Sequence, residues 1–293
     1  MRLAPMCFMH VQKCAGSSVR AMLEAALPPG SLSPRRIDRA NFASFDDFGG
    51  LSPEARASVV VDEADFRELA AYPAVCGHLS LPTLAALAPP SRIATILREP
   101  RARLLSYYLH LRFSVALRTI WAHYGVHRPA ERPLPEFLSE ASLATTIDNR
   151  VCRMLLHGDP RIRDGDFVAE GDVERLAEEA WARLEQLGFV GILERPDEAW
   201  RGLGEHFGVE LRPVRRNVSG AAEVQPGMLP VPLLGGADTL ELLERRTAAD
   251  AIVFQRLAAR LEGGERAAHR LAEAAFAEQL VRYGSFTSSP ATS

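Results

Sequence analysis

The fold is decided by the stretch Phe8-Met-His-Val-Gln-Lys-Cys-Ala-Gly-Ser-Ser18, close to the start of the chain. The apolar run from Pro5 to Val11 predicts a short buried strand, and Gln12 to Gly16 predicts a turn. Ser17 to Ala26 then predicts a helix with a serine near its N-cap. Backbone N–H groups at such a helix start attract anions, and Lys13 adds a positive charge. The stretch predicts a phosphate-type anion site, although an ordinary strand–helix turn fits the same pattern.

Strands and helices alternate along the rest of the chain. Apolar runs predict further strands at 58–61, 74–77, 92–97 and 188–193. Helices are predicted at 17–26, 62–71, 81–87, 100–117, 134–140, 146–157, 173–187, 196–207, 239–261 and 265–283. This alternation predicts the α/β class, with three layers, a mostly parallel sheet flanked by helices, and a helix-rich C-terminal half. We expect a single domain over residues 1–284, with long loops at 27–53 and 218–238, and a disordered tail at 285–293.

The composition narrows the choice of partners. A net charge of −3 over 293 residues argues against a general polyanion binder, so no nucleic-acid partner is expected. No apolar stretch reaches the roughly 18–20 residues of a membrane-spanning helix, and the opening residues do not form a signal peptide. The four cysteines contain no CxxC pair, and no histidine cluster has zinc spacing, so neither a disulfide framework nor a metal is predicted. A cytoplasmic protein without a metal is the simplest interpretation.

Three polar residues follow three predicted strands. Lys13, which is the only lysine in the chain, His78 and Arg98 each lie just beyond such a strand. Parallel α/β sheets bind ligands at the carboxyl ends of their strands, so these side chains are expected at one site. Ser106 lies about two turns into the following helix, within reach of a phosphate that Arg98 binds. A structural hydrogen-bonding role for His78 stays open, and Arg101 is expected to be a solvated helix residue.

Two stretches resemble the motifs of carbohydrate sulfotransferases. Residues 8–18 resemble the 5'-phosphosulfate loop of that family, whose usual form is F-x-H-x-P-K-x-x-G-[ST]-[ST]. Leu97-Arg-Glu-Pro-Arg-Ala-Arg-Leu-Leu-Ser-Tyr-Tyr108 resembles the family's 3'-phosphate motif, L-R-[DE]-P-x-x-R-x-x-S-x-Y. The two stand in the family's order, about 80 residues apart. Weaker likenesses occur at 76–79, 148–155, 189–195 and 216–219, and the nearest branch is the bacterial and uronyl O-sulfotransferase-like group, which has a P-loop-like fold.

The resemblance implies an activity and a set of roles. It implies transfer of the sulfuryl group of 3'-phosphoadenosine-5'-phosphosulfate (PAPS) to an acceptor hydroxyl, with a saccharide the first candidate, and release of PAP without a metal. Lys13 would stabilise charge on the departing phosphate, and His78 would take the acceptor's proton as its oxygen attacks sulfur in line. The nucleotide-binding residues that it implies are Lys13, Cys14, Ala15, Gly16, Ser17, Ser18, Arg98, Ser106, Arg216, Asn217 and Ser219.

The chain departs from the family pattern in three places. Gln12 stands where the family has proline, and Cys14-Ala15 replace the usual Thr-Gly or Thr-Ala. Cys14 is interpreted as a small side chain that fits the loop, not as a nucleophile, and His10 as a residue that supports the loop. The segment after Ser219 reads Gly-Ala-Ala-Glu and lacks the family's basic residues, which leaves the nucleotide role of 216–219 open.

Two other functions fit parts of the pattern. An ATP-dependent small-molecule kinase would use the same strand–loop–helix, but it should show a GxxxxGK[ST] loop and an acidic Mg²⁺ ligand at a strand end, and neither is clear here. A non-catalytic nucleotide-binding protein on the same fold is the second alternative. Residues 148–153 are expected either to contact substrate or to brace a helix. The acceptor could be a saccharide, a lipid or a small metabolite, and the oligomeric state is open.

Overall fold

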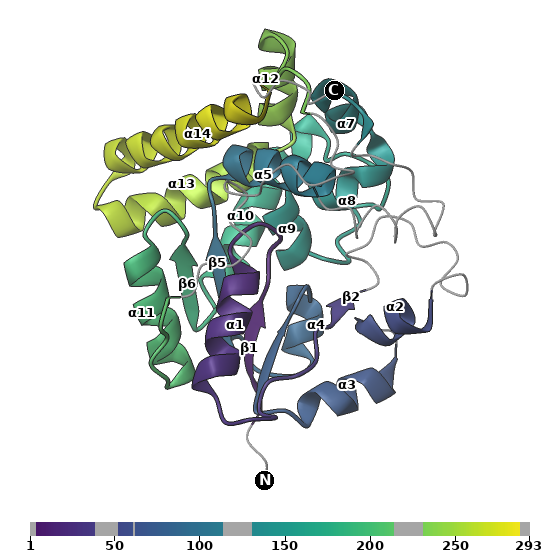
Figure 1. Cartoon of the computed structure of the whole chain (residues 1–293), viewed down its shortest axis with the longest axis vertical. Coiled ribbons are helices and arrows are strands. Elements are labelled where there is room, and N and C mark those ends of the chain that lie inside the picture. Colours follow the sequence, from purple (N-terminus) through teal and green to yellow (C-terminus); the bar gives the residue numbers. More distant parts are fainter. Residues whose placement is uncertain (1–3, 39–51, 61, 114–130, 214–230, 288–293) are drawn as a thin grey trace, which may run out of the picture.

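The computed structural model describes residues 4–38, 52–60, 62–113, 131–213 and 231–287. Within these ranges a parallel four-stranded sheet has the order β4-β1-β5-β6 (Figure 1). Its strands are β1 (Met6–Met9), β4 (Ala74–Gly77), β5 (Ile93–Leu97) and β6 (Phe189–Ile192). Met9 pairs with Gly77 on one side and with Thr95 on the other, so the carboxyl ends of the strands meet at one edge.

Helices cover both faces of this sheet. They include α1 (Gly16–Ala26), α9 (Arg150–Leu155), α10 (Val173–Leu184), α11 (Pro196–Phe207) and α13 (Ala248–Glu262). Successive strand residues point to opposite faces, so Phe8 packs in a cluster with α1 and α11, whereas Met9 packs in another with α9, α10 and α13. Strands that are buried on both faces explain the apolar runs in the sequence. The predicted α/β class and its three layers are confirmed.

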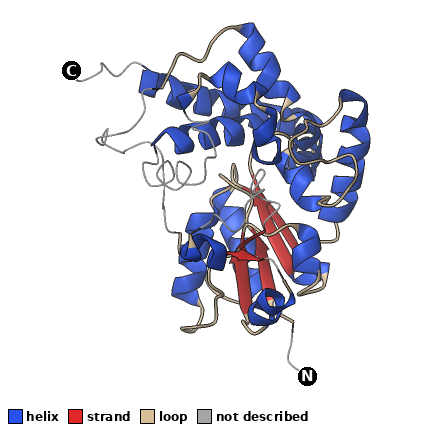
Figure 2. Ribbon diagram, turned by 90° about the vertical axis from the view of Figure 1, so that its right-hand side faces the viewer, coloured by secondary structure: helices blue, strands red, loops and turns tan. Residues whose placement is uncertain are grey.

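A second, purely helical core lies beyond one end of the sheet. Figure 2 shows the strands in one half of the molecule and this helical part in the other. Its helices are α5 (Pro100–Phe113), α7 (Leu134–Ser139), α12 (Ala237–Arg245) and α14 (Glu265–Thr287). Tyr108, Phe137, Leu243, Phe276 and Tyr283 meet in its centre, all of them buried. The expected helix-rich C-terminal half is thus confirmed, and α14 packs on both α5 and α13.

Six shorter elements complete the described fold. They are β2 (Ile37–Asp38), α2 (Pro53–Ser58), β3 (Val59–Val60), α3 (Glu63–Ala70), α4 (Leu81–Ala85), which packs on β1 and α9, and α8 (Ala144–Ile147), which packs on α9. β2 and β3 form a separate two-stranded parallel sheet. Isolated bridges join Leu32 to Ala74 and Ile37 to His78, so the segment after α1 runs along β4.

Two helices that the sequence pattern predicts as continuous are broken. The predicted helix 146–157 divides into α8 and α9 at Asp148–Asn149, and the predicted helix 239–261 divides into α12 and α13 at Arg246–Thr247. Asn149 has a left-handed backbone, with φ of 44°, and its N–H donates to the Arg246 carbonyl at 2.7 Å. The two breaks therefore meet in space, and each depends on the other.

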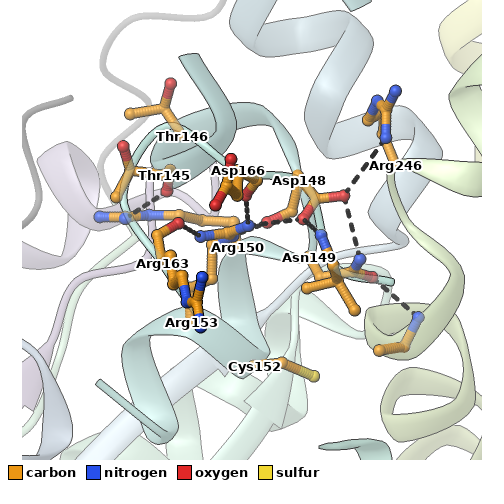
Figure 3. Close-up of polar contacts among 12 residues, drawn as sticks. Thr145, Thr146, Asp148, Asn149, Arg150, Cys152, Arg153, Arg163, Asp166 and Arg246 are labelled. Carbon is orange, nitrogen blue, oxygen red and sulfur yellow. Dashed lines mark hydrogen bonds and ion pairs between the residues drawn. The ribbon is translucent and has the colours of Figure 1, made fainter. Parts of the chain in front are cut away.

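Each side of this junction caps the helix of the other side, and Figure 3 shows Asn149 and Arg246 at the junction. The Asn149 Oδ1 accepts a hydrogen bond from Ala249 N–H at 2.8 Å, at the start of α13. The Asp250 carboxylate accepts from Val151 N–H and Cys152 N–H, both at 2.9 Å, at the start of α9. Because the first N–H groups of a helix have no intrahelical partner, such caps stabilise both helix starts.

The predicted C-terminal tail begins too early. Residues 285–287 continue α14, so a disordered tail from 285 is wrong for these three residues. They remain helical because Phe286 packs on Phe113 with ring centroids 4.7 Å apart. The predicted end of the α5 helix at 114–117, residues 218–230 of the predicted late loop, and residues 288–293 lie outside the described residues.

Candidate anion-binding site

The loop between β1 and α1 has an unusual backbone. Lys13 and Ala15 adopt left-handed conformations, with φ of 66° and 58°, which residues with a Cβ seldom occupy. The Cys14 N–H donates to the Val11 carbonyl at 3.2 Å and closes the turn. Such conformations cost of order 1–3 kcal/mol each, and they cluster at functional sites where the surrounding structure holds them. This turn is therefore a candidate site.

The first backbone N–H groups of α1 form a candidate position for binding an anion. The helix begins at Gly16, and its N-cap Ala15 makes no side-chain capping bond. The helix thus starts one residue before the predicted Ser17, and Ser17 and Ser18 lie near the N-cap, but neither is the N-cap residue itself. The Ala15 carbonyl accepts from the N–H groups of Ser18 and Val19 at 2.9 and 3.0 Å. The N–H groups ahead of these have no partner within the helix, and the helix dipole favours an anion there.

His10 packs against this loop at Gly16 and supports its conformation. A Cβ at Gly16 would lie only 1.8 Å from the Cδ2 of His10, so only glycine allows the helix start to pack on the imidazole. His10 is buried, and burial holds its pKa well below the usual value for histidine. The interpretation of His10 as a supporting residue therefore agrees with the geometry.

His78 follows β4 and lies against His10. Their rings stack with centroids 4.0 Å apart. The Nδ1 of His78 lies 2.8 Å from the His10 carbonyl oxygen, which can only accept, so Nδ1 carries the proton of the neutral ring and Nε2 is the basic nitrogen. Burial lowers the pKa of His78 to about 4, so the ring is neutral at pH 7.

Cations gather around Lys13. Burial lowers the pKa of Lys13 to about 8, and the positive charges of Arg98 and Arg282 lower it further in the same direction. His110 of α5 has its pKa lowered to about 4 by burial and then by the charges of Lys13 and His78. An opposite charge would stabilise every one of these cationic forms. The edge formed by Lys13, His78 and Arg98 is therefore suited to an anion, as expected from the ends of three strands.

Arg98 and Arg101 differ in the groups that hold them. Arg98 follows β5, and its Nη2 donates to the neutral amide oxygen of Gln279 at 2.8 Å. Arg101 forms ion pairs with Glu99 and Glu273, each at 2.7 Å, and its side chain is only 15% exposed. The expectation of a solvated Arg101 is wrong, because two carboxylates and the Phe276 ring surround it. The hydrogen-bond partner of Arg98 is thus a neutral amide and not a carboxylate, although the buried Glu194 carboxyl also interacts with its charge.

Ser106 lies on the same face of α5 as two other residues of the site. Arg103, Ser106 and His110 are spaced by three and four residues, which places them in one row along a helix. The charge of Arg103 acts on Cys14 and on Arg98. Ser106 is buried between these two residues of the row, of which Arg103 interacts electrostatically with Cys14 and His110 with Lys13 of the β1–α1 loop. The proximity of Ser106 to a phosphate bound by Arg98 stays a prediction.

Four residues of this neighbourhood were not predicted as site residues. They are Gln12, His110, Gln279 and Arg282, whereas Arg150 belongs to the segment 148–153, for which both a substrate contact and a bracing role were expected. The Nε of Arg150 donates to Gln12 Oε1 at 2.6 Å and its Nη1 donates to the Thr145 carbonyl at 2.7 Å, which joins α9 to the loop. The signal for His110 was its spacing of four from Ser106. No local signal marks Gln279 or Arg282, because only the packing of α14 on α5 brings them here.

The segment 148–153 braces the fold, apart from Arg150. The Arg153 guanidinium pairs with the Asp148 carboxylate at 2.8 Å and also donates to the carbonyls of Asp148, Arg163 and Asp166. Figure 3 shows these residues, and the Arg153 and Asp148 side chains are almost completely buried. Cys14 is also buried, and burial raises the pKa of its thiol to about 12, which agrees with a small fitting side chain and not with a thiolate.

Three predicted site residues lie outside the described residues, and two further predictions concern a metal site and a membrane-spanning helix. Arg216, Asn217 and Ser219 lie outside the described residues. Among the residues that the structure covers, no group of three or more His, Cys, Asp or Glu side chains is placed to hold a metal ion. Within the same ranges, no helix combines the length and the apolar character needed to cross a bilayer.

Comparisons with known proteins identify no family for this chain. No protein-family model matches the chain, and no curated protein matches it.

Proposed function

We propose that the chain is a PAPS-dependent sulfotransferase that acts on an acceptor hydroxyl, with a saccharide as the first candidate acceptor. The observation that carries the proposal is the cation cluster at the carboxyl edge, where Lys13 is surrounded by the charges of Arg98 and Arg282 and stands before the uncapped start of α1. A nucleotide with phosphate groups at two positions fits two neighbouring anion subsites. The two sequence motifs that resemble sulfotransferases support the same assignment.

The residues of the site suit the nucleotide in separate regions. The N–H groups from Ala15 to Ser18 would bind the 5'-phosphosulfate, because a helix start presents donors without intrahelical partners. Arg98 and Ser106 would bind the 3'-phosphate. The buried Nε2 of Gln279 has no hydrogen-bond acceptor among the described residues, which is a further sign that a ligand acceptor belongs here.

The proposed reaction needs one charge and one base from the protein. As the acceptor oxygen forms its bond to sulfur, the bond from sulfur to the 5'-phosphate oxygen breaks, and Lys13 would stabilise the charge that develops on that phosphate. The Nε2 of His78 would receive the acceptor's proton. A pKa of about 4 makes His78 a weak base, but the bound nucleotide's negative charge would raise that pKa.

Glu99, the carboxylate that follows Arg98 at the end of β5, has protein partners, which disfavours it as the Mg²⁺ ligand of a kinase. It accepts from Ala102 N–H at 2.7 Å and pairs with Arg101. Glu194, beyond β6, accepts from Glu99 N–H at 2.9 Å through Oε1, whereas its buried Oε2 has no hydrogen-bond partner among the described residues. All four cysteines are free thiols, which supports the proposal of a reducing, cytoplasmic setting.

Calorimetry with PAP, ATP and ADP tests the proposal, with and without Mg²⁺. We expect PAP to bind most tightly and independently of Mg²⁺; tighter binding of ATP would overturn the proposal in favour of a kinase. Labelled PAPS with a panel of saccharide, lipid and small-metabolite acceptors then tests for transfer. PAP binding without any transfer would support the non-catalytic alternative. His78→Ala should lower transfer about 100-fold, with His269→Ala at an exposed position of α14 as the matched control, and an unchanged rate would remove His78 as the base.

A further inference from the structure

The helix α14 presents two side chains to the proposed nucleotide site that no motif assigns. Gln279 and Arg282 are spaced by three residues and share one face of the helix. Gln279 is 2% exposed, and its Oε1 accepts from Arg98 Nη2 at 2.8 Å. The charge of Arg282 acts on both Lys13 and Arg98. A helix from the far end of the chain therefore reaches the strand edge.

Both side chains carry buried donors without an acceptor. The Nε2 of Gln279 and the Nη2 of Arg282 have no hydrogen-bond partner among the described residues. Buried donors are nearly always paired in folded proteins, so two unpaired donors one helical turn apart require an explanation. Both lie beside Arg98, where an anionic acceptor would satisfy them and reduce the repulsion between the neighbouring cations.

Helix α14 also contacts Arg101, an arginine that has a structural role. Glu273 lies about two and a half turns before Arg282, and its carboxylate pairs with Arg101 at 2.7 Å. At Arg98 the helix provides instead a neutral amide, which fixes the guanidinium without cancelling its charge. The acidic group that acts on Arg282 is Glu278, an exposed residue. The amide therefore adds no negative charge from α14 at Arg98, where the acidic group that acts on the guanidinium is the buried Glu194 beyond β6.

We propose that α14 forms part of the 3'-phosphate subsite, in which Arg282 binds the 3'-phosphate as a second cation and Gln279 positions Arg98 while donating from Nε2. This inference rests on the proposed PAPS site and assigns it selectivity for nucleotides with a 3'-phosphomonoester. A bidentate guanidinium suits a phosphate, and two of them with an amide would surround its oxygens.

Calorimetric titration with PAP and with AMP tests the inference, because AMP lacks the 3'-phosphate. Arg282→Ala should weaken PAP binding about 10–100-fold, which corresponds to a lost hydrogen bond with a charged group, and should change AMP binding less than 3-fold. Gln279→Leu should weaken PAP binding about tenfold with the same selectivity. Arg270→Ala, at an exposed position of the same helix, is the matched control and should leave both affinities unchanged.

Conservative variants separate this role from a general effect on folding. Arg282→Lys should recover part of the PAP affinity. Gln279→Glu should lower it more than Gln279→Leu, because its carboxylate would neutralise Arg98, while the melting temperature stays close to that of the wild type. Equal losses for PAP and AMP, or unchanged PAP binding in Arg282→Ala, would overturn the inference alone. A wild-type protein that binds no PAP would overturn it together with the proposed function.

Discussion

Two regions of this protein use arginine in opposite ways. At the junction of α9 and α13, Arg153 is buried with a carboxylate and three carbonyl oxygens around it. At the carboxyl edge of the sheet, Lys13 and Arg98 face other cations, and Arg98 is held by a neutral amide. The first arrangement satisfies its charges within the fold. The second leaves them available, which is an unfavourable state unless a ligand anion compensates it.

Whether a cation has a carboxylate partner distinguishes residues that stabilise the fold from residues that bind a ligand more clearly than the extent of burial does. Both regions are largely shielded from solvent, and both lie close to α9. A buried ion pair that loses one partner leaves an uncompensated charge in the interior. When a cation that lies beside other cations is replaced by a neutral residue, no oppositely charged partner is left unpaired. Variants of the two regions should therefore fail in different ways.

The largest effect is expected from Asp148→Ala. It leaves the Arg153 guanidinium buried without its carboxylate, and we expect the free energy of unfolding to fall by about 3–5 kcal/mol. Chemical denaturation measures this change. Asp172→Ala, which breaks the more exposed pair with Arg175, is the matched control and should have a much smaller effect. Equal losses for the two variants would contradict the distinction.

The second effect concerns Lys13→Ala. Loss of the ammonium should lower sulfuryl transfer by about 10²–10³-fold, because charge on the departing phosphate would no longer be stabilised. The free energy of unfolding should stay the same or rise slightly, since the substitution relieves repulsion with Arg98 and Arg282. Steady-state kinetics and denaturation of the same preparation check both parts. A large loss of stability would show that Lys13 belongs with the structural charges.

The smallest effect is the pH dependence of PAP binding. The pKa of Lys13 is about 8 in the free protein, and a bound anion would raise it, so the complex holds a proton that the free protein loses above pH 8. Affinity should begin to fall as the pH approaches 8 and should fall by at most about tenfold per pH unit well above it. Nucleotide phosphates, whose second pKa is about 6, do not titrate in this range.

Calorimetry between pH 7.5 and 9.5 measures this slope. Lys13→Ala should bind PAP more weakly and without the dependence above pH 8. A wild-type affinity that rises with pH would contradict the assignment of the slope to Lys13.

Local sequence pattern is sufficient for much of the fold and for part of the site. Strand β4 and helix α11 begin and end where their apolar runs and Pro196 predict them. The ends of three strands place Lys13, His78 and Arg98 together, because parallel strands share one carboxyl edge. These features depend on neighbours in the chain, so periodicity and turn residues contain the information.

Tertiary packing decides the remainder. The breaks at Asn149 and Arg246 depend on caps supplied from about 100 residues away, and the helical pattern on either side continues without interruption. The position of Arg282 beside Lys13 likewise depends on how α14 packs against α5. Hydrogen bonds and charges act through space, so the pairing of Asn149 with α13, and of Gln279 with Arg98, exists only in the folded chain.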